Sequence, residues 1–322
     1  MLDNASQETV FDEVGRPICD AVLEGFNGTI MCYGQTGAGK SFSMVGDGHD
    51  YHLRGIAPRA FGRIFREMAD RPEWVYTARL SFLEIYNENL YDLLATLPEF
   101  GPRVELSLLS DGRSGVPVKG LTAAEVKSEE EALRYLFEAE ANRAVAQHAL
   151  NRHSSRSHVL YMLQIERRSR MHSSGAMQTA RLTLVDLAGS ERLKKSKEVS
   201  SAAEANLPPA LRQQQQRQQL EAMAINKSLT FLEQVVMALG KRGQVLTLTL
   251  TLRVSLTLTL RLTLTLTLTL TPNPNPNQAH VPHRSSRLTA VLRDALGGNC
   301  RTTLVANIWG EARHVEETVP TL

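Results

Sequence analysis

Apolar residues along the chain follow two spacings, one typical of strands and one typical of helices. Runs of strand length predict buried strands at residues 28–33, 74–85, 159–165, 180–187 and 302–309. Helical spacing predicts helices at residues 11–24, 58–68, 129–143, 223–239 and 286–296, and short helical turns at 41–44 and 90–94. Because strands and helices alternate along the chain, we expect an α/β fold with a central, mostly parallel sheet and helices on both faces.

Two stretches interrupt this pattern. A glutamine tract at residues 213–219 falls in an expected extended loop, residues 193–222, where we expect it to be solvated. From residue 246 to 271, every even position is Leu or Val and every odd position is Thr, Ser or Arg. This period of two is that of a strand, but the run is far longer than an ordinary strand, and its low charge favours aggregation.

The Thr-Leu run continues into alternating Pro and Asn at residues 272–277. The nucleotide repeat CCCTAA encodes Thr-Leu in one reading frame and Pro-Asn in the next, so one slipped base converts the first run into the second. We therefore hypothesise that residues 245–278 are a low-complexity insertion, a translated simple repeat from a retained intron or an expansion. The alternative is a functional β segment, which the usual length of strands disfavours.

Charge and cysteine content indicate which partners and which cellular compartment to expect. The 36 Lys and Arg residues nearly balance the 34 Asp and Glu residues, and the net charge of +2 provides no global field for a nucleic acid. Cys19, Cys32 and Cys300 lack metal-type or redox-type spacing and fit a reducing compartment. With no signal peptide and no apolar run long enough for a bilayer, we expect a soluble cytosolic protein without nucleic-acid or membrane partners.

The clearest chemical motif lies between the first strand and the helical turn that follows it. It matches the phosphate-binding pattern G-x-x-x-x-G-K-[S/T] and consists of Gly34, Gln35, Thr36, Gly37, Ala38, Gly39, Lys40 and Ser41. Glycines let the backbone wrap closely around an anion, and N–H groups at a helix start favour phosphate. We expect Lys40 to reach the β- and γ-phosphates and Ser41 to ligate Mg²⁺. The strand–loop–helix setting disfavours the alternative, a glycine-rich turn that binds nothing.

Two further motifs supply groups for Mg²⁺ and a γ-phosphate. Asp186 ends an apolar strand, where a carboxylate can anchor Mg²⁺, and the Gly189 backbone N–H can face the γ-phosphate. Residues 151–158, NRHSSRSH, are dense in hydroxyls that suit Mg²⁺ and phosphate oxygens. Arg156 and Glu191 carry the opposite charges that could close the site as an ion pair. Alone, residues 151–158 could equally be a solvated loop, and their histidines, His148 included, do not indicate a metal site.

The three motifs together resemble those of one family. GQTGAGKS, NRHSSRSH and DLAGSE, in this order, look like the P-loop, switch I and switch II of kinesin motor domains. Residues 225–229 resemble the start of the kinesin switch II helix, and residues 280–289 with 292–299 resemble the loop and helix that grip tubulin. Residues 228–234 and 307–311 look most like the kinesin-9 class, which is associated with cilia and flagella.

The resemblance implies a P-loop NTPase fold and a microtubule-stimulated ATPase that uses ATP and Mg²⁺ and moves along or grips microtubules. Ser155 would complete the Mg²⁺ shell, while Asn151 and Ser154 would contact the γ-phosphate side. Arg156 and Glu191 would pair to position the attacking water, and Gly189 would drive the helix that starts near Ala222. The candidates for the acidic tubulin surface are Lys227, Arg284, Arg287 and Arg293. For Arg293 a solvated position is the favoured alternative.

The chain also departs from the family pattern. Kinesins begin with a strand carrying an Arg-x-Arg-Pro motif and end with a helix and neck linker, so we expect residues 1–322 to be a partial motor domain truncated at both ends, with one edge of the sheet missing. The insertion splits the tubulin-binding element before His280. We expect a cytoplasmic, cytoskeletal protein, with a cilium or flagellum as a further location, and homodimerisation through other regions is left open.

Two alternative functions remain open at this point. A degenerate motor would act as a microtubule-binding module that is insensitive to nucleotide; the intact motifs disfavour it, while the insertion favours it. A P-loop GTPase is disfavoured because residues 226–229, NKSL, fail the guanine-binding pattern Asn-Lys-x-Asp at its fourth position.

Overall fold

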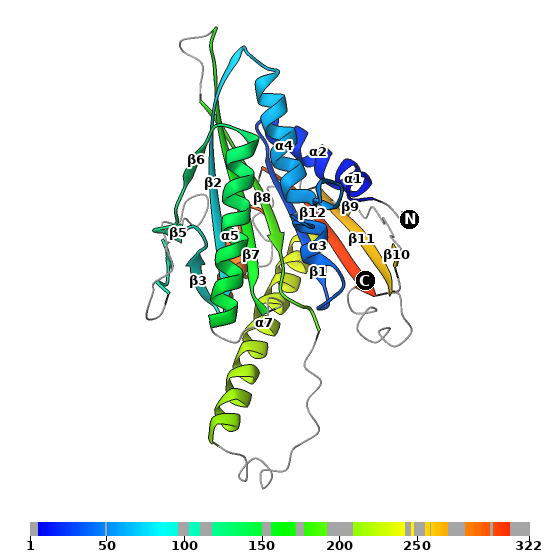
Figure 1. Ribbon diagram of the computed structural model, residues 1–322, viewed down its shortest axis with the longest axis vertical. Coiled ribbons are helices and arrows are strands. Elements are labelled where there is room, and N and C mark those ends of the chain that lie inside the picture. The colour runs from blue at the N-terminus through cyan, green and yellow to red at the C-terminus, as the bar shows by residue number, and fades with distance from the viewer. Residues whose placement is uncertain are drawn as a thin grey trace.

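The fold is described from a computed structural model, in which one central sheet runs through the molecule (Figure 1). The structure describes residues 6–48, 50–95, 103–109, 118–149, 156–171, 177–191, 209–241, 246–247, 255–257, 259–269, 281–296 and 299–309. The strand order in the sheet is β10-β11-β12-β1-β8-β7-β2-β3. The helices are α1 (Gln7–Val10), the π-helix Phe11–Gly15, α2 (Arg16–Leu23), α3 (Lys40–Met44), the 3-10 helix Tyr51–Leu53, α4 (Ile56–Ala69), α5 (Glu129–Ala149), α7 (Pro209–Lys241) and α8 (Arg287–Val291).

The sheet is mixed rather than mostly parallel. Only the centre is parallel among the described strands, where β1 (Asn27–Gly34) pairs with β12 (Cys300–Trp309) on one side and β8 (Gln178–Asp186) on the other. The pairs of β7 (His158–Ser169) with β8 and with β2 (Trp74–Tyr86) are antiparallel. Because β7 and β8 follow each other closely in the chain, a hairpin joins them, and hairpins give antiparallel pairs. The small strands are β4 (Ser107–Leu108), β5 (Val118–Lys119), β6 (Ala124–Val126), β9 (Leu246–Thr247) and β10 (Ser255–Thr257).

Helices cover both faces of the sheet, as predicted. Side chains alternate between the two faces of a strand, and β1 shows the consequence: Ile30 and Cys32 join a buried cluster with α2, α4 and α5, whereas Met31 joins a second cluster with α7 and α8. Ile30, Met31 and Cys32 are at most 3% exposed, so β1 is buried on both faces. The strand that leads to the phosphate-binding motif is therefore held from both sides.

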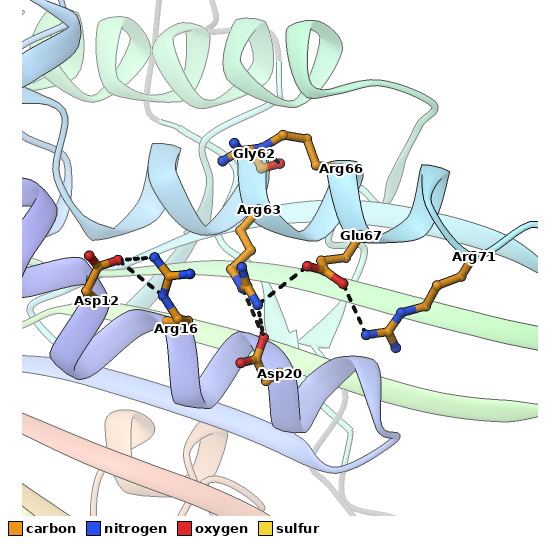
Figure 2. Close-up of polar contacts among 8 residues, drawn as sticks. All are labelled: Asp12, Arg16, Asp20, Gly62, Arg63, Arg66, Glu67 and Arg71. Carbon is orange, nitrogen blue, oxygen red and sulfur yellow. Dashed lines mark hydrogen bonds and ion pairs between the residues drawn. The ribbon is translucent and has the colours of Figure 1, made fainter.

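Ion pairs fasten α2, which leads into β1, to α4 (Figure 2). Arg63 of α4 lies with Nη2 2.7 Å from Asp20 Oδ1 of α2 and 3.5 Å from Glu67 Oε1. Glu67 also accepts from Arg71, just beyond the end of α4, at 3.1 Å, so Glu67 lies between two arginines. Of these partly exposed pairs, Arg63–Asp20 connects the two helices, and each pair contributes little to stability.

Residues 90–94 were expected to form a helical turn, and the structure places them differently. Leu90 belongs to β3 (Asn89–Asp92), which pairs antiparallel with β2. Asn87 and Glu88 both have positive φ, 50° and 60°, and form the two-residue turn between the strands. Turns of this kind match the twist of a hairpin, so strand pairing overrides the local helical pattern.

The glutamine tract is helical rather than part of a loop. Helix α7 begins at Pro209 and continues through the tract to Lys241. Proline suits the first position of a helix, and glutamine is a good helix former. The predicted loop at 193–222 is therefore helical from residue 209 on, and its earlier part lies outside the described residues.

The Thr-Leu repeat forms a strand of the sheet beside β12. Strand β11 (Thr259–Thr269) pairs antiparallel with β12 over nine positions, from Arg261 opposite Trp309 to Thr269 opposite Arg301. The strict alternation of residues fits this extended backbone. The repeat therefore covers the sheet edge beside β12, with β10 and β9 paired to it in turn. The predicted helix at 286–296 is confirmed in its first part as α8.

Within the described residues, no helix combines the length and apolarity that a membrane crossing needs.

Candidate active site

The phosphate-binding motif forms the turn between the end of β1 and the start of α3, as predicted. Gly34, Gly37 and Gly39 have φ values of 144°, 80° and 97°, a region that side chains disfavour. A Cβ on Gly34 would also lie 1.9 Å from the carbonyl oxygen of Asn307 on β12. The loop conformation therefore requires these glycines and leaves the backbone free to approach an anion.

Lys40 lies at the first position of α3 and is only 6% exposed. Its Nζ donates to the carbonyl oxygen of Gln35 at 2.9 Å, which folds the side chain back over the loop. Burial lowers the pKa of Lys40, while the carboxylates of Asp186 and Glu191 oppose this shift. The ammonium group thus lies where a bound phosphate would need a counter-charge.

Ser41 and Asp186 meet at the ends of neighbouring elements. Ser41 Oγ donates to Asp186 Oδ2 at 2.5 Å, and Asp186 is 2% exposed at the end of β8. Asp186 Oδ1 is buried and has no hydrogen-bond partner within the described part of the chain. A hydroxyl and a carboxylate with an unused oxygen are oxygen ligands that Mg²⁺ accepts together with phosphate oxygens and water. The residues present therefore fit the metal that the sequence predicted.

Arg143, which the sequence analysis did not single out, supports this carboxylate. It extends from α5, is 4% exposed, and lies with Nη1 3.6 Å from Asp186 Oδ2 and 3.6 Å from Glu140 Oε2. Burial acts to lower the pKa of Arg143, but Glu140, Tyr161 and Asp186 outweigh it and raise that pKa above its ordinary value. No local motif marks Arg143, because its partner is distant in sequence.

Gly189 and Glu191 approach the phosphate-binding loop directly. Glu191 accepts from the Thr36 backbone N–H at 2.8 Å and from the Thr36 hydroxyl at 2.5 Å. A Cβ on Gly189 would lie 2.3 Å from Glu191 Oε2 and 2.4 Å from Thr36 Oγ1. In this arrangement a Cβ at position 189 would require the Glu191 and Thr36 side chains to move.

The predicted ion pair between Arg156 and Glu191 is not formed in the structure. Arg156 Nη1 donates to Glu221 Oε2 of α7 at 2.5 Å, and the Tyr86 hydroxyl donates to the other oxygen of Glu221. Glu191 instead accepts hydrogen bonds from Thr36, so the carboxylate that pairs with Arg156 is that of Glu221 on α7. Sequence reasoning missed Glu221 because it lies 65 residues from Arg156.

The remaining predicted residues of switch I are Asn151, Ser154 and Ser155, which lie outside the described residues. Within the part of the chain that the structure describes, no three His, Cys, Asp or Glu side chains form a cluster that could hold a metal. A metal at Ser41 and Asp186 would therefore need further oxygen ligands, such as phosphate and water.

The residues predicted to contact tubulin lie on α7 and around α8. Lys227, Arg284 and Arg287 are exposed, whereas Arg293 is partly buried. Glu88 of the β2–β3 turn contacts both elements: its Oε2 lies 3.9 Å from Lys227 Nζ and accepts from the Arg287 backbone N–H at 3.2 Å. The structure thus brings Lys227 and Arg287 to a common surface beside that turn.

Three features lie at the ends of the neighbouring parallel strands β1 and β8: the loop with Lys40, the Ser41–Asp186 hydrogen bond and the closely packed Gly189. Together they define a P-loop nucleotide-binding protein. The chain belongs to the kinesin motor domain family, whose model matches residues 1–322. The family resemblance and the fold class predicted from the sequence are thereby confirmed.

Similar proteins agree on the class. The chain is 41% identical to kinesin-like protein KIF9 of Mus musculus over 322 residues, which is all of this chain and 34% of that protein. It is 41% identical to kinesin-like protein KLP1 of Chlamydomonas reinhardtii, covering 35% of that protein. The solved structure described as "Structure of a fast kinesin: Implications for ATPase mechanism and interactions with microtubules" matches with a TM-score of 0.73 at 33% identity, covering 98% of this chain and 74% of that one. The chain spans about a third of the length of these curated relatives.

Proposed function

We propose that this chain is an ATP-hydrolysing motor domain whose nucleotide state controls its binding to microtubules. The observation that carries the proposal is the contact between Ser41 and Asp186, because it joins the phosphate-binding loop to the switch II motif. Membership of the kinesin family supports it, as does similarity to a solved fast kinesin that is described in terms of an ATPase mechanism and interactions with microtubules.

The phosphate groups of ATP are held by the loop amides at 34–41 and by Lys40, whose buried ammonium neutralises their charge. Ser41, Asp186 and Ser155 would hold Mg²⁺, which would supply further positive charge to the phosphoryl group. Arg143 orients the Asp186 carboxylate through its ion pair.

Closure of the site exchanges two contacts. For Arg156 and Glu191 to pair and position the attacking water, Glu191 leaves Thr36 and Arg156 leaves Glu221. Asn151 and Ser154 contact the γ-phosphate side in the closed site, and Gly189 presents its backbone to the same phosphate. Contacts to the γ-phosphate that order switch segments, and their loss on hydrolysis, are how such sites signal.

The partner surface is basic and exposed. Lys227, Arg284 and Arg287 provide positive charge for the acidic surface of tubulin, while Arg293, being partly buried, contributes less. We infer a place on the cytoskeleton of the cytoplasm and, from similarity to the kinesin-9 class, in a cilium or flagellum. Homodimerisation through regions outside this chain is compatible with the proposal.

Phosphate release from ATP by the full chain, measured with and without microtubules, tests the proposal. We expect microtubules to stimulate release, and Ser41→Ala to lower the stimulated rate by at least about tenfold, since it removes a Mg²⁺ ligand. The matched control is Ser107→Ala, an exposed serine on β4, which should behave like the unaltered chain. Absence of ATP-dependent phosphate release, or full activity of Ser41→Ala, would refute the proposal.

A further inference from the structure

His158 lies between two parts of the molecule that the proposed function requires to move together. It is the first residue of β7 and is 3% exposed. Its Nδ1 lies 3.0 Å from the Ala188 backbone nitrogen, next to Gly189, and its Nε2 lies 2.8 Å from Ser228 Oγ on α7, next to Lys227. One imidazole ring therefore spans the distance between switch II and the helix of the proposed microtubule surface.

The direction of each hydrogen bond follows from the charge of the ring. Burial lowers the pKa of His158 to about 3, and the cations of Lys40 and Arg143 add to that shift, so the ring is neutral near pH 7. A neutral imidazole has one donor and one acceptor nitrogen. The Ala188 N–H can only donate, which makes Nδ1 the acceptor and leaves the Nε2 proton to be donated to Ser228.

The chain of hydrogen bonds then continues into the helix backbone. Ser228 Oγ donates to the Ile225 carbonyl oxygen at 2.8 Å while it accepts from His158. The Ala188 N–H, the His158 Nε2–H and the Ser228 hydroxyl thus all donate in the same direction, toward the Ile225 carbonyl oxygen, which accepts the last bond. Such buried chains, when fully satisfied, fix the relative positions of the elements they join.

We propose that His158 is a positioning residue that couples the γ-phosphate-sensing segment at Gly189 to the position of α7, through its hydrogen bonds to Ala188 and Ser228. This inference rests on the proposed function. A planar ring cannot shorten, so a displacement of Ala188 requires either a matching displacement of Ser228 or the loss of one of the two bonds. Both hydrogen bonds require histidine at position 158, because the shorter Asn side chain can replace the Nδ1 acceptor but cannot also reach Ser228.

The test measures the affinity of the full chain for microtubules in ADP and in a non-hydrolysable ATP analogue. The ratio of the two affinities is the coupling. We expect His158→Asn and Ser228→Ala each to reduce this ratio by about fivefold, the size expected for one buried neutral hydrogen bond. The double variant should reduce it no further than either single variant, because both break the same connection.

Matched controls separate coupling from general damage. His52→Asn and Ser107→Ala alter an exposed histidine and an exposed serine and should leave the ratio unchanged. Should His158→Asn fold poorly, Ser228→Ala alone decides, because it removes a single oxygen. An unchanged ratio in folded Ser228→Ala, or additive effects in the double variant, would overturn the inference while leaving the proposed function intact. Equal affinities in the two nucleotides for the unaltered chain would overturn both.

Discussion

At Gly189 a Cβ has no room unless the neighbouring side chains move. A Cβ there would lie within 2.4 Å of oxygens of Glu191 and Thr36, so Gly189→Ala must push Glu191 off the phosphate-binding loop. We expect ATP to bind still, because Lys40 and the loop glycines are untouched. Microtubule-stimulated hydrolysis should fall by at least about tenfold, because a displaced segment would no longer hold the backbone N–H of residue 189 at the reacting phosphate. Nucleotide titration and phosphate release on one preparation check both statements, and equal hydrolysis rates would contradict them.

Arg143 shows how burial determines the contribution of an ion pair to the free energy of unfolding. The side chains of Arg143 and Asp186 are 5% and 2% exposed, against 21% and 43% for Arg63 and Asp20. Arg143→Met leaves a buried carboxylate without its counter-charge and should lower the free energy of unfolding by about 3–5 kcal/mol. Arg63→Met, the control, should cost about 1 kcal/mol or less. Urea unfolding measures both, and similar small losses would refute a structural role for Arg143.

Among elements, α7 is the one whose extent the sequence did not predict. Its helix runs through the glutamine tract, where Gln216 is exposed. Gln216→Pro removes a backbone donor and should disrupt the helix locally at a cost of about 3 kcal/mol, whereas Gln216→Ala should preserve it. Amide hydrogen exchange over residues 212–220 should be slow in the unaltered chain and fast in the proline variant. Fast exchange in both would restore the predicted loop.

The pairing of the Thr-Leu strand β11 with β12 predicts that the repeat contributes to the stability of the sheet. Deleting residues 245–278 removes β11 and exposes the edge of β12, which loses nine cross-strand pairs. At roughly 0.2–1 kcal/mol per pair, unfolding should become easier by about 2 kcal/mol or more. Replacing only residues 272–277 with Gly and Ser is the control and should have little effect. A deletion variant as stable as the whole chain would show that the repeat is dispensable to the sheet.

Strands and helices with clear periodicity were predicted from the sequence, and the phosphate-binding loop was predicted because its residues are adjacent in the chain. The helical glutamine tract is an error about local structure, whereas the other errors involve distant partners. Leu90 joins a strand because β2 pairs with it, and the sheet is mixed because hairpins join its outer strands. Arg143 and Glu221 meet Asp186 and Arg156 across long stretches of sequence, so no local pattern could have indicated either contact.

In the molecule as a whole, helix α7 links the proposed nucleotide site to the basic surface. Its Glu221 accepts from Arg156, and its Lys227 is exposed and lies beside the turn at Glu88. In Figure 1, α7 extends well beyond the lower edge of the sheet. A change of partner at Arg156 therefore bears on the helix that carries the proposed microtubule contacts.

Co-sedimentation of the full chain with microtubules, in a non-hydrolysable ATP analogue and in ADP, tests this account most directly. Tighter binding in the analogue is the expected result, because γ-phosphate contacts at Gly189 would reposition α7 and its basic surface. Binding of equal strength in both nucleotides would contradict the account and would leave a microtubule-binding module that does not respond to its nucleotide.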